Sequence, residues 1–172
     1  MFESIDDEIK NFIEDEGRDL KYKPNDEIRP LNFDCSPSIA YDYLELDTKK
    51  EFSFFNTEIN NSTSEEFPAL SDAQIYFMRI KNICKNSFDN LNDEIKFFKL
   101  ISPNKKLRKL FESIFAQKLE AEQLPQFIEI ILYTNKKSNK APRIFGFIGN
   151  ANIIYILFYD PFHEIFNKTG KI

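Results

Sequence analysis

Three short apolar runs in the last third of the chain most constrain how it can fold. They span residues 126–134, 143–148 and 152–160, and most of their positions carry large apolar side chains. Strands that are apolar on both sides lie inside a sheet whose two faces are both covered. The residues Gly149-Asn150-Ala151 separate the last two runs and predict a hairpin turn. The sequence therefore predicts an antiparallel sheet that needs a cover on each face.

Two amphipathic segments can supply one of these covers. Ser71 and Gln74 form a capping-box pattern for a helix that continues to about Lys85. Residues 102–104 are expected to open another helix, which runs to about Ala121 with apolar side chains at helical spacing. The other cover is expected from the N-terminal part of the chain or from a second copy of the protein.

The segments before these helices are less regular. Residues 51–59 are expected to form a strand, and 88–101 is ambiguous between helix and strand. We interpret 96–101 as a strand because apolar and basic positions are interleaved there. The resulting prediction is an α+β fold in residues 51–172, with an antiparallel sheet packed against two or three helices.

Charge divides the chain into two parts. Residues 1–72 carry 19 acidic and 7 basic side chains, whereas residues 73–172 carry 9 acidic and 16 basic. Opposite net charges attract, so an acidic, partly ordered arm over residues 1–50 is expected to compete with polyanions for basic surface. Chance clustering of solvating charge is the alternative. A short helix in the arm has an apolar stripe that can bind the sheet or another protein, formed by Ile5, Ile9, Phe12 and Ile13.

Composition and motifs argue against several classes of protein. The longest apolar run, 153–159, has seven residues, far fewer than the roughly 20 needed to span a bilayer. The N-terminal sequence is acidic and lacks the order of a secretory signal, so we expect a cytoplasmic protein. Two cysteines give no disulfide framework, and Cys84 is expected in the core. A single histidine and no glycine-rich nucleotide loop predict neither a metal nor a cofactor.

Three polar residues interrupt or follow the apolar runs, namely Glu129, Arg143 and His163. Because side chains alternate along strands, antiparallel neighbours would bring them to one end of one face. RNA cleavage through the 2′-hydroxyl requires such groups. Glu129 would accept the 2′-hydroxyl proton, Arg143 would stabilise the phosphorane and His163 would protonate the leaving 5′-oxygen. The alternative is structural. Glu129 would be the edge-facing charge of a strand, Arg143 would pair with Glu129 or Asp160, and His163 would satisfy hydrogen bonds in its turn.

Two groups of basic residues are candidates for binding the phosphates of a nucleic acid. One group lies in the first turns of the second expected helix, and the other lies in the loop before residue 143. Several such charges on one surface neutralise a nucleic-acid backbone, whereas a solvated surface is the alternative. The residues are Lys105, Lys106, Arg108 and Lys109 in the helix, and Lys136, Lys137 and Lys140 in the loop.

The order of these features resembles a known family. Residues 71–172, with helices before an antiparallel sheet and with Glu129, Arg143 and His163 in succession, resemble the RelE/ParE superfamily of bacterial toxins. Within it the likeness is to YoeB-type mRNA interferases. The resemblance implies a small bacterial or mobile-element toxin, an endoribonuclease acting on RNA or at the ribosome, with those three residues as its catalytic groups. The acidic arm would then be autoinhibitory.

Two other classes of function remain open from the sequence. One is a non-enzymatic interaction protein, such as a phage-type inhibitor or a nucleic-acid mimic, whose acidic arm binds a basic partner. The other is an assembly subunit that forms a homo-oligomer through the doubly apolar sheet.

Overall fold

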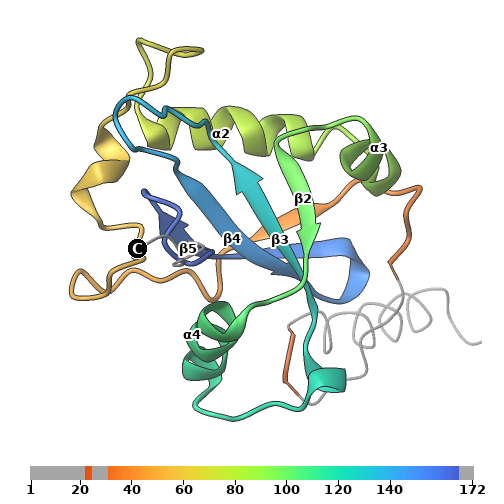
Figure 1. The fold of residues 1–172 in the computed structure, drawn as a ribbon. Coiled ribbons are helices and arrows are strands. Elements are labelled where there is room, and N and C mark those ends of the chain that lie inside the picture. The colour runs from red at the N-terminus through yellow and green to blue at the C-terminus, as the bar shows by residue number, and fades with distance from the viewer. Residues whose placement is uncertain (1–21, 25–30, 167–172) are drawn as a thin grey trace, which may run out of the picture.

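The fold is built on one five-stranded sheet, shown in the computed structural model of Figure 1. The structure describes residues 22–24 and 31–166. The strand order is β1-β5-β4-β3-β2, with antiparallel neighbours throughout except that β1 runs parallel to β5. The predicted α+β class is confirmed. The strands are β1 (Ser38–Ala40), β2 (Phe98–Ile101), β3 (Gln126–Ile131), β4 (Arg143–Ile148) and β5 (Ile153–Asp160).

The α-helices begin at side-chain caps, formed by Ser71, Ser87 and Asn104. Ser71 and Gln74 form the predicted capping box of α2, with bonds of 3.3 and 2.9 Å. The last helix ends at Phe115, earlier than predicted, because Ala116 adopts a left-handed conformation (φ 50°) that stops it. The α-helices are α2 (Asp72–Ile83), α3 (Phe88–Asp93) and α4 (Lys105–Phe115), and the 3-10 helices are η1 (Thr57–Asn60), η2 (Ala121–Gln123) and η3 (Asn150–Asn152).

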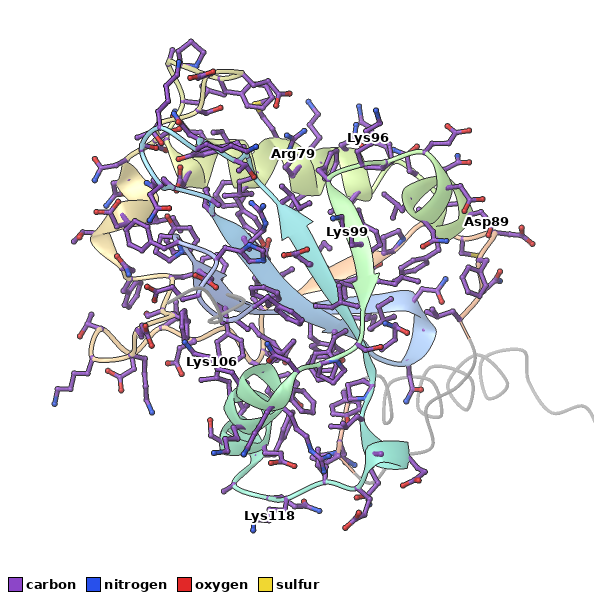
Figure 2. All side chains as sticks on the ribbon, viewed as in Figure 1. Arg79, Asp89, Lys96, Lys99, Lys106 and Lys118 are labelled. Atoms are coloured by element: carbon purple, nitrogen blue, oxygen red, sulfur yellow. The ribbon has the colours of Figure 1, made fainter. Side chains whose placement is uncertain are left out.

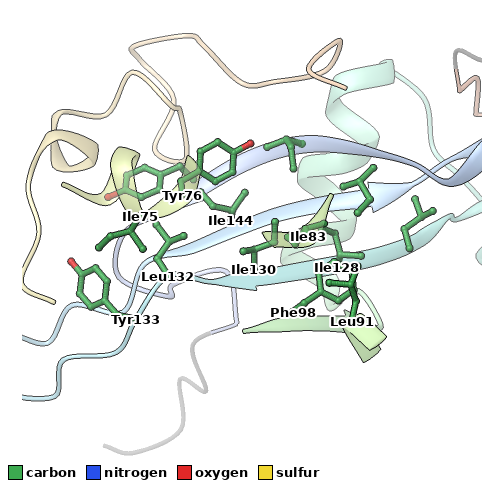
Figure 3. Packing of buried hydrophobic residues seen from close by; sticks show 14 of the residues in the cluster. Ile75, Tyr76, Ile83, Leu91, Phe98, Ile128, Ile130, Leu132, Tyr133 and Ile144 are labelled. Atoms are coloured by element: carbon green, nitrogen blue, oxygen red, sulfur yellow. The ribbon is translucent and has the colours of Figure 1, made fainter. Parts of the chain in front are cut away.

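The two faces of the sheet pack against different helices (Figure 1). α2 and α3 cover a face of mainly aliphatic side chains, where Ile75 and Ile83 meet Ile128, Ile130 and Ile144 (Figure 3). α4 covers the opposite face, which is rich in phenylalanine. There the Phe111 ring lies 5.0 Å from that of Phe127 and 5.2 Å from that of Phe147. The chain thus supplies its own cover for both faces.

The described part of the acidic N-terminal region belongs to this core. β1 pairs with β5, and Tyr22 is buried against the phenylalanine-rich face. The Tyr43 hydroxyl donates to the Tyr22 carbonyl at 2.6 Å, and Asn32 exchanges two hydrogen bonds with Asn152. The predicted apolar stripe of Ile5, Ile9, Phe12 and Ile13 lies outside the described residues.

Two local predictions are wrong. Residues 51–59 form turns and η1 instead of a strand, because the side chains of Ser53 and Asn56 accept hydrogen bonds from backbone N–H groups two residues later. Cys84 caps the end of α2 in an exposed position, while the buried position is its neighbour Ile83. The ambiguous segment 88–101 divides into α3 and β2, which confirms the strand at its end.

Candidate functional site

Glu129, Arg143 and His163 come together on the face of the sheet that α4 covers. Glu129 Oε1 lies 3.1 Å from His163 Nε2 and 3.4 Å from Arg143 Nε. The antiparallel register explains the contact with Arg143, since Glu129 pairs with Phe145 and the residue two positions before Phe145, Arg143, points to the same face. The turn after β5 then brings His163 to the same carboxylate. We call these three residues the Glu129 cluster.

The guanidinium group of Arg143 makes its contacts within the protein. Its Nη1 donates to the carbonyls of Tyr133 and Pro142 at 2.7 and 3.1 Å, and its Nη2 donates to Thr134 Oγ1 at 2.9 Å. Only 7% of the residue is exposed. The predicted role of Arg143 as a phosphate stabiliser therefore needs correction, because in this arrangement its donors hold the β3–β4 connection and its charge faces Glu129.

Glu129 is buried and keeps its negative charge. Burial by itself would raise the pKa of Glu129, but the hydrogen bond from His163 and the positive charges of Arg143 and Lys99 outweigh burial and lower this pKa below its ordinary value. Lys99 is the register partner of Glu129 on β2. A carboxylate that is enclosed in this way is suited to orient the imidazole that contacts it.

His163 is the member of the Glu129 cluster that reaches the surface, with 35% of its side chain exposed. Its backbone is left-handed (φ 60°), a conformation that costs a residue with a side chain about 1 kcal/mol. The ring contacts Glu129 through Nε2. A strained residue that presents a reactive ring beside a buried carboxylate is typical of a functional site.

The two predicted groups of basic residues do not form one surface. α4 lies on one side of the sheet, whereas the connection between β3 and β4 lies beside the start of α2 (Figure 1). Lys140 is buried and pairs with Asp72 and Glu58 at 3.2 Å each, so it is not available to a nucleic acid. Lys137 pairs with Glu65 at 3.2 Å, and Lys136 in the same loop is exposed.

The basic group on α4 lies closer to the Glu129 cluster. Lys106 Nζ donates to the carbonyl of Glu164, the residue after His163, at 3.4 Å. Arg108 is occupied by Glu112 and by the carbonyl of Leu119. The remaining members of the group, Lys105 and Lys109, are exposed.

Two residues that surround the site were not predicted as site residues from the sequence. Lys99 is exposed on the outer strand, and Figure 2 shows it between Lys96 and Lys106 along one side of the molecule. Asp160 ends β5 and is fully buried, and its carboxylate accepts three backbone hydrogen bonds from the turn that carries His163. An aspartate before a proline at the end of an apolar run is a turn signal that could have identified Asp160.

A second buried polar group, which we call the Asp72 cluster, joins the start of α2 to the sheet. The Asp72 carboxylate accepts from the hydroxyls of Tyr133 and Tyr159 at 2.8 and 2.6 Å and pairs with Lys140. Burial would lower the pKa of Lys140, but the neighbouring charge of Asp72 raises it. Tyr133 and Tyr159 are also buried, so the cluster is closed to solvent.

No family model, curated protein or solved structure matches this chain. Within residues 22–24 and 31–166, no helix is long and apolar enough to cross a membrane. The same residues contain no group of three or more His, Cys, Asp or Glu side chains placed to hold a metal ion. Function is therefore inferred from the chemistry of the Glu129 cluster itself.

Proposed function

We propose that the protein is an endoribonuclease of the kind that the RelE/ParE resemblance implies, with His163 as its acid–base residue. The observation that carries this proposal is the 3.1 Å contact between Glu129 Oε1 and the partly exposed imidazole of His163. A buried carboxylate that holds one ring nitrogen fixes the orientation of the imidazole. The other nitrogen is then set to exchange a proton with a bound substrate.

The proposed reaction is attack of an RNA 2′-oxygen on the adjacent phosphorus. The 2′-hydroxyl proton passes to water as the bond from the 2′-oxygen to phosphorus forms. The bond from phosphorus to the 5′-oxygen breaks, and His163 Nδ1–H gives its proton to that oxygen. The products are a 2′,3′-cyclic phosphate and a 5′-hydroxyl, and the imidazole regains its proton from solvent. In this scheme Glu129 is the counter-charge of His163, and Arg143 is a positioning residue that holds Glu129.

Phosphate binding in this proposal depends on exposed lysines near the cluster. Lys99 lies opposite Glu129 on β2, and Lys106 contacts the backbone next to His163. Exposed ammonium groups near the cluster attract the backbone of RNA without selecting a base. Lys106 also pairs with Glu51 at 4.0 Å and lies 4.5 Å from the centre of the Phe52 ring, so RNA would compete with Glu51 for it. Residues 1–21 carry 8 acidic and 3 basic side chains, so they would compete with RNA for this surface and act as an autoinhibitory segment.

The proposal can be tested by induced expression of full-length variants in bacteria. We would compare the natural chain with a chain in which Asp6, Asp7, Glu14 and Asp15 are changed to amides, which weakens the acidic segment. We expect growth arrest and fragmented RNA, stronger in the amide variant, and loss of both effects when His163→Ala is added. Lys137→Ala, at an exposed ion pair in the other basic group, is the matched control and should keep them. Intact RNA in a soluble, folded amide variant would contradict the proposal.

A second candidate function is protein binding, and exposed aromatic side chains favour it. Phe77 on α2 is 63% exposed and Tyr41 is 44% exposed, and both contact Tyr76. Exposed aromatic groups that lie together are typical of protein interfaces. The test is whether the protein forms an oligomer or binds a partner protein. Binding that is lost in Phe77→Ser but unchanged in His163→Ala would favour this function over the ribonuclease.

A further inference from the structure

We propose that Asp160 is a positioning residue, which fixes the turn that presents the His163 ring to Glu129. The positioning role is inferred from the hydrogen bonds of the turn. Its consequence for catalysis rests on the proposed function. Asp160 does not touch the imidazole in this arrangement. It acts through the backbone on both sides of His163.

The carboxylate of Asp160 is the hydrogen-bonding centre of the turn. Its Oδ1 accepts from the N–H groups of Phe162 at 3.3 Å and Glu164 at 2.9 Å, and its Oδ2 accepts from the N–H of Ile165 at 2.7 Å. Asp160 is 0% exposed. Burial raises the pKa of Asp160, although the three N–H donors and the nearby His163 lower it. The three hydrogen bonds offset the cost of burying the carboxylate. They form together when the backbone of His163 is left-handed, so they favour that conformation.

Apolar packing inside the turn does not supply this constraint. Phe162, the apolar residue next to His163, is 42% exposed. Other contacts of the segment lie mainly at its two ends, where Ile165 is buried in the phenylalanine-rich core, and Lys106 donates to the Glu164 carbonyl between them. Pro161 accepts a bond from the Ala141 N–H at 3.2 Å, and the Ile165 carbonyl accepts from Asn104 Nδ2 at 2.6 Å. Between these anchors, Asp160 is the side chain that holds the backbone on both sides of His163, while Glu129 contacts the ring itself.

The test is Asp160→Asn in the full chain, with Asp72→Asn as the control. The substituted amide keeps one acceptor oxygen but turns an NH₂ group toward an N–H that needs an acceptor. Asp72 is equally buried but belongs to the other cluster. Asp72→Asn therefore controls for the general effect of losing a buried carboxylate. Because His163 is the only histidine, its ring Hε1 proton gives a single assignable NMR signal, and its rate of carbethoxylation reports exposure.

We expect Asp160→Asn to move the Hε1 signal toward its position in the unfolded chain and to raise the carbethoxylation rate several-fold. Asp72→Asn should leave both unchanged. If RNA cleavage is measurable, Asp160→Asn should lower kcat by about 10- to 100-fold with KM nearly constant. An unchanged histidine signal in folded Asp160→Asn would overturn the proposal whether or not the protein cleaves RNA.

A measurement on the natural chain covers the case in which Asp160→Asn fails to fold. Amide hydrogen exchange should show the N–H groups of Phe162, Glu164 and Ile165 protected, although all three residues lie outside the sheet. Exchange of these three amides at the rate of an unfolded peptide would also overturn the proposal. Absence of RNA cleavage together with protected amides would instead remove the ribonuclease function and keep the positioning role.

Discussion

The Asp72 cluster and the Glu129 cluster contain similar chemical groups but differ in their access to solvent. Each has a buried carboxylate held by a cation and by a ring side chain. In the Asp72 cluster both tyrosines and Lys140 are enclosed. In the Glu129 cluster the enclosed part is Glu129 and Arg143, and His163 remains one-third exposed.

This difference separates a stabilising role from a chemical one. A closed network of satisfied polar groups joins secondary-structure elements and has no route to a substrate. A network with one exposed titratable ring can orient that ring and pass protons to a ligand. We therefore expect substitutions in the Asp72 cluster to affect mainly stability and substitutions at His163 to affect mainly activity.

The largest expected effect is on stability, in Asp72→Ala. Removing this carboxylate leaves the Lys140 ammonium buried with a weaker set of partners and removes the acceptor for two tyrosine hydroxyls. We expect a loss of about 3–5 kcal/mol in the free energy of unfolding, measured by urea denaturation. A loss below about 1 kcal/mol would mean that the Asp72 cluster does not stabilise the fold.

Glu129→Gln should affect both properties. The change removes the counter-charge of buried Arg143 and of His163, and we expect a loss of about 2 kcal/mol in unfolding free energy. RNA cleavage should fall about 100-fold, because the imidazolium loses its partner. Full activity in Glu129→Gln would show that the carboxylate is only structural, as in the Asp72 cluster.

The pH dependence of stability should show the contribution of Glu129. Its pKa is lower in the folded chain than its ordinary value of 4.5, so the unfolded chain binds more protons between these two values. The stabilisation is therefore complete above about pH 4.5 and is lost as pH falls through the folded-state pKa. The stability difference between the natural chain and Glu129→Gln should shrink below pH 4.5. Asp160 is present in both chains, so its opposite, raised pKa largely cancels in this difference.

The smallest expected effect distinguishes strain at His163 from loss of its contact. His163→Ala and His163→Gly both remove the imidazole, but only glycine adopts φ 60° without a steric cost. We expect the glycine variant to be more stable than the alanine variant by about 1 kcal/mol in urea denaturation. Equal stabilities would show that the turn relaxes when the imidazole is removed.

Parts of this fold could be predicted because they have local signals. The apolar runs and the turn at residues 149–151 predicted the β4–β5 hairpin, and the alternation of side chains placed Glu129 and Arg143 on one face. β1 was missed because a three-residue parallel strand has no periodic signal. The strand predicted at 51–59 was wrong because side chain–backbone bonds at Ser53 and Asn56 stabilise turns there.

The chemistry of Arg143 and Lys140 could not be read from the sequence. Both are basic residues in or beside a loop, which is typical of a phosphate-binding surface. Their burial depends on how the β3–β4 connection crosses the start of α2, and that path is a tertiary property. The alternation of side chains placed Glu129 and Arg143 on one face, but the sequence left open whether His163 joins them and did not predict that only His163 reaches solvent.

The most direct test of the central claim is RNA cleavage by the purified full chain in which Asp6, Asp7, Glu14 and Asp15 are changed to amides. The substrate is a labelled single-stranded RNA, with the matching 2′-deoxy strand as control. We expect cleavage that leaves a 2′,3′-cyclic phosphate, that is absent on the 2′-deoxy strand, and that falls at least about 100-fold when His163→Ala is added. No cleavage, or equal cleavage with and without His163, would contradict the assignment of His163 as an acid–base residue acting on RNA.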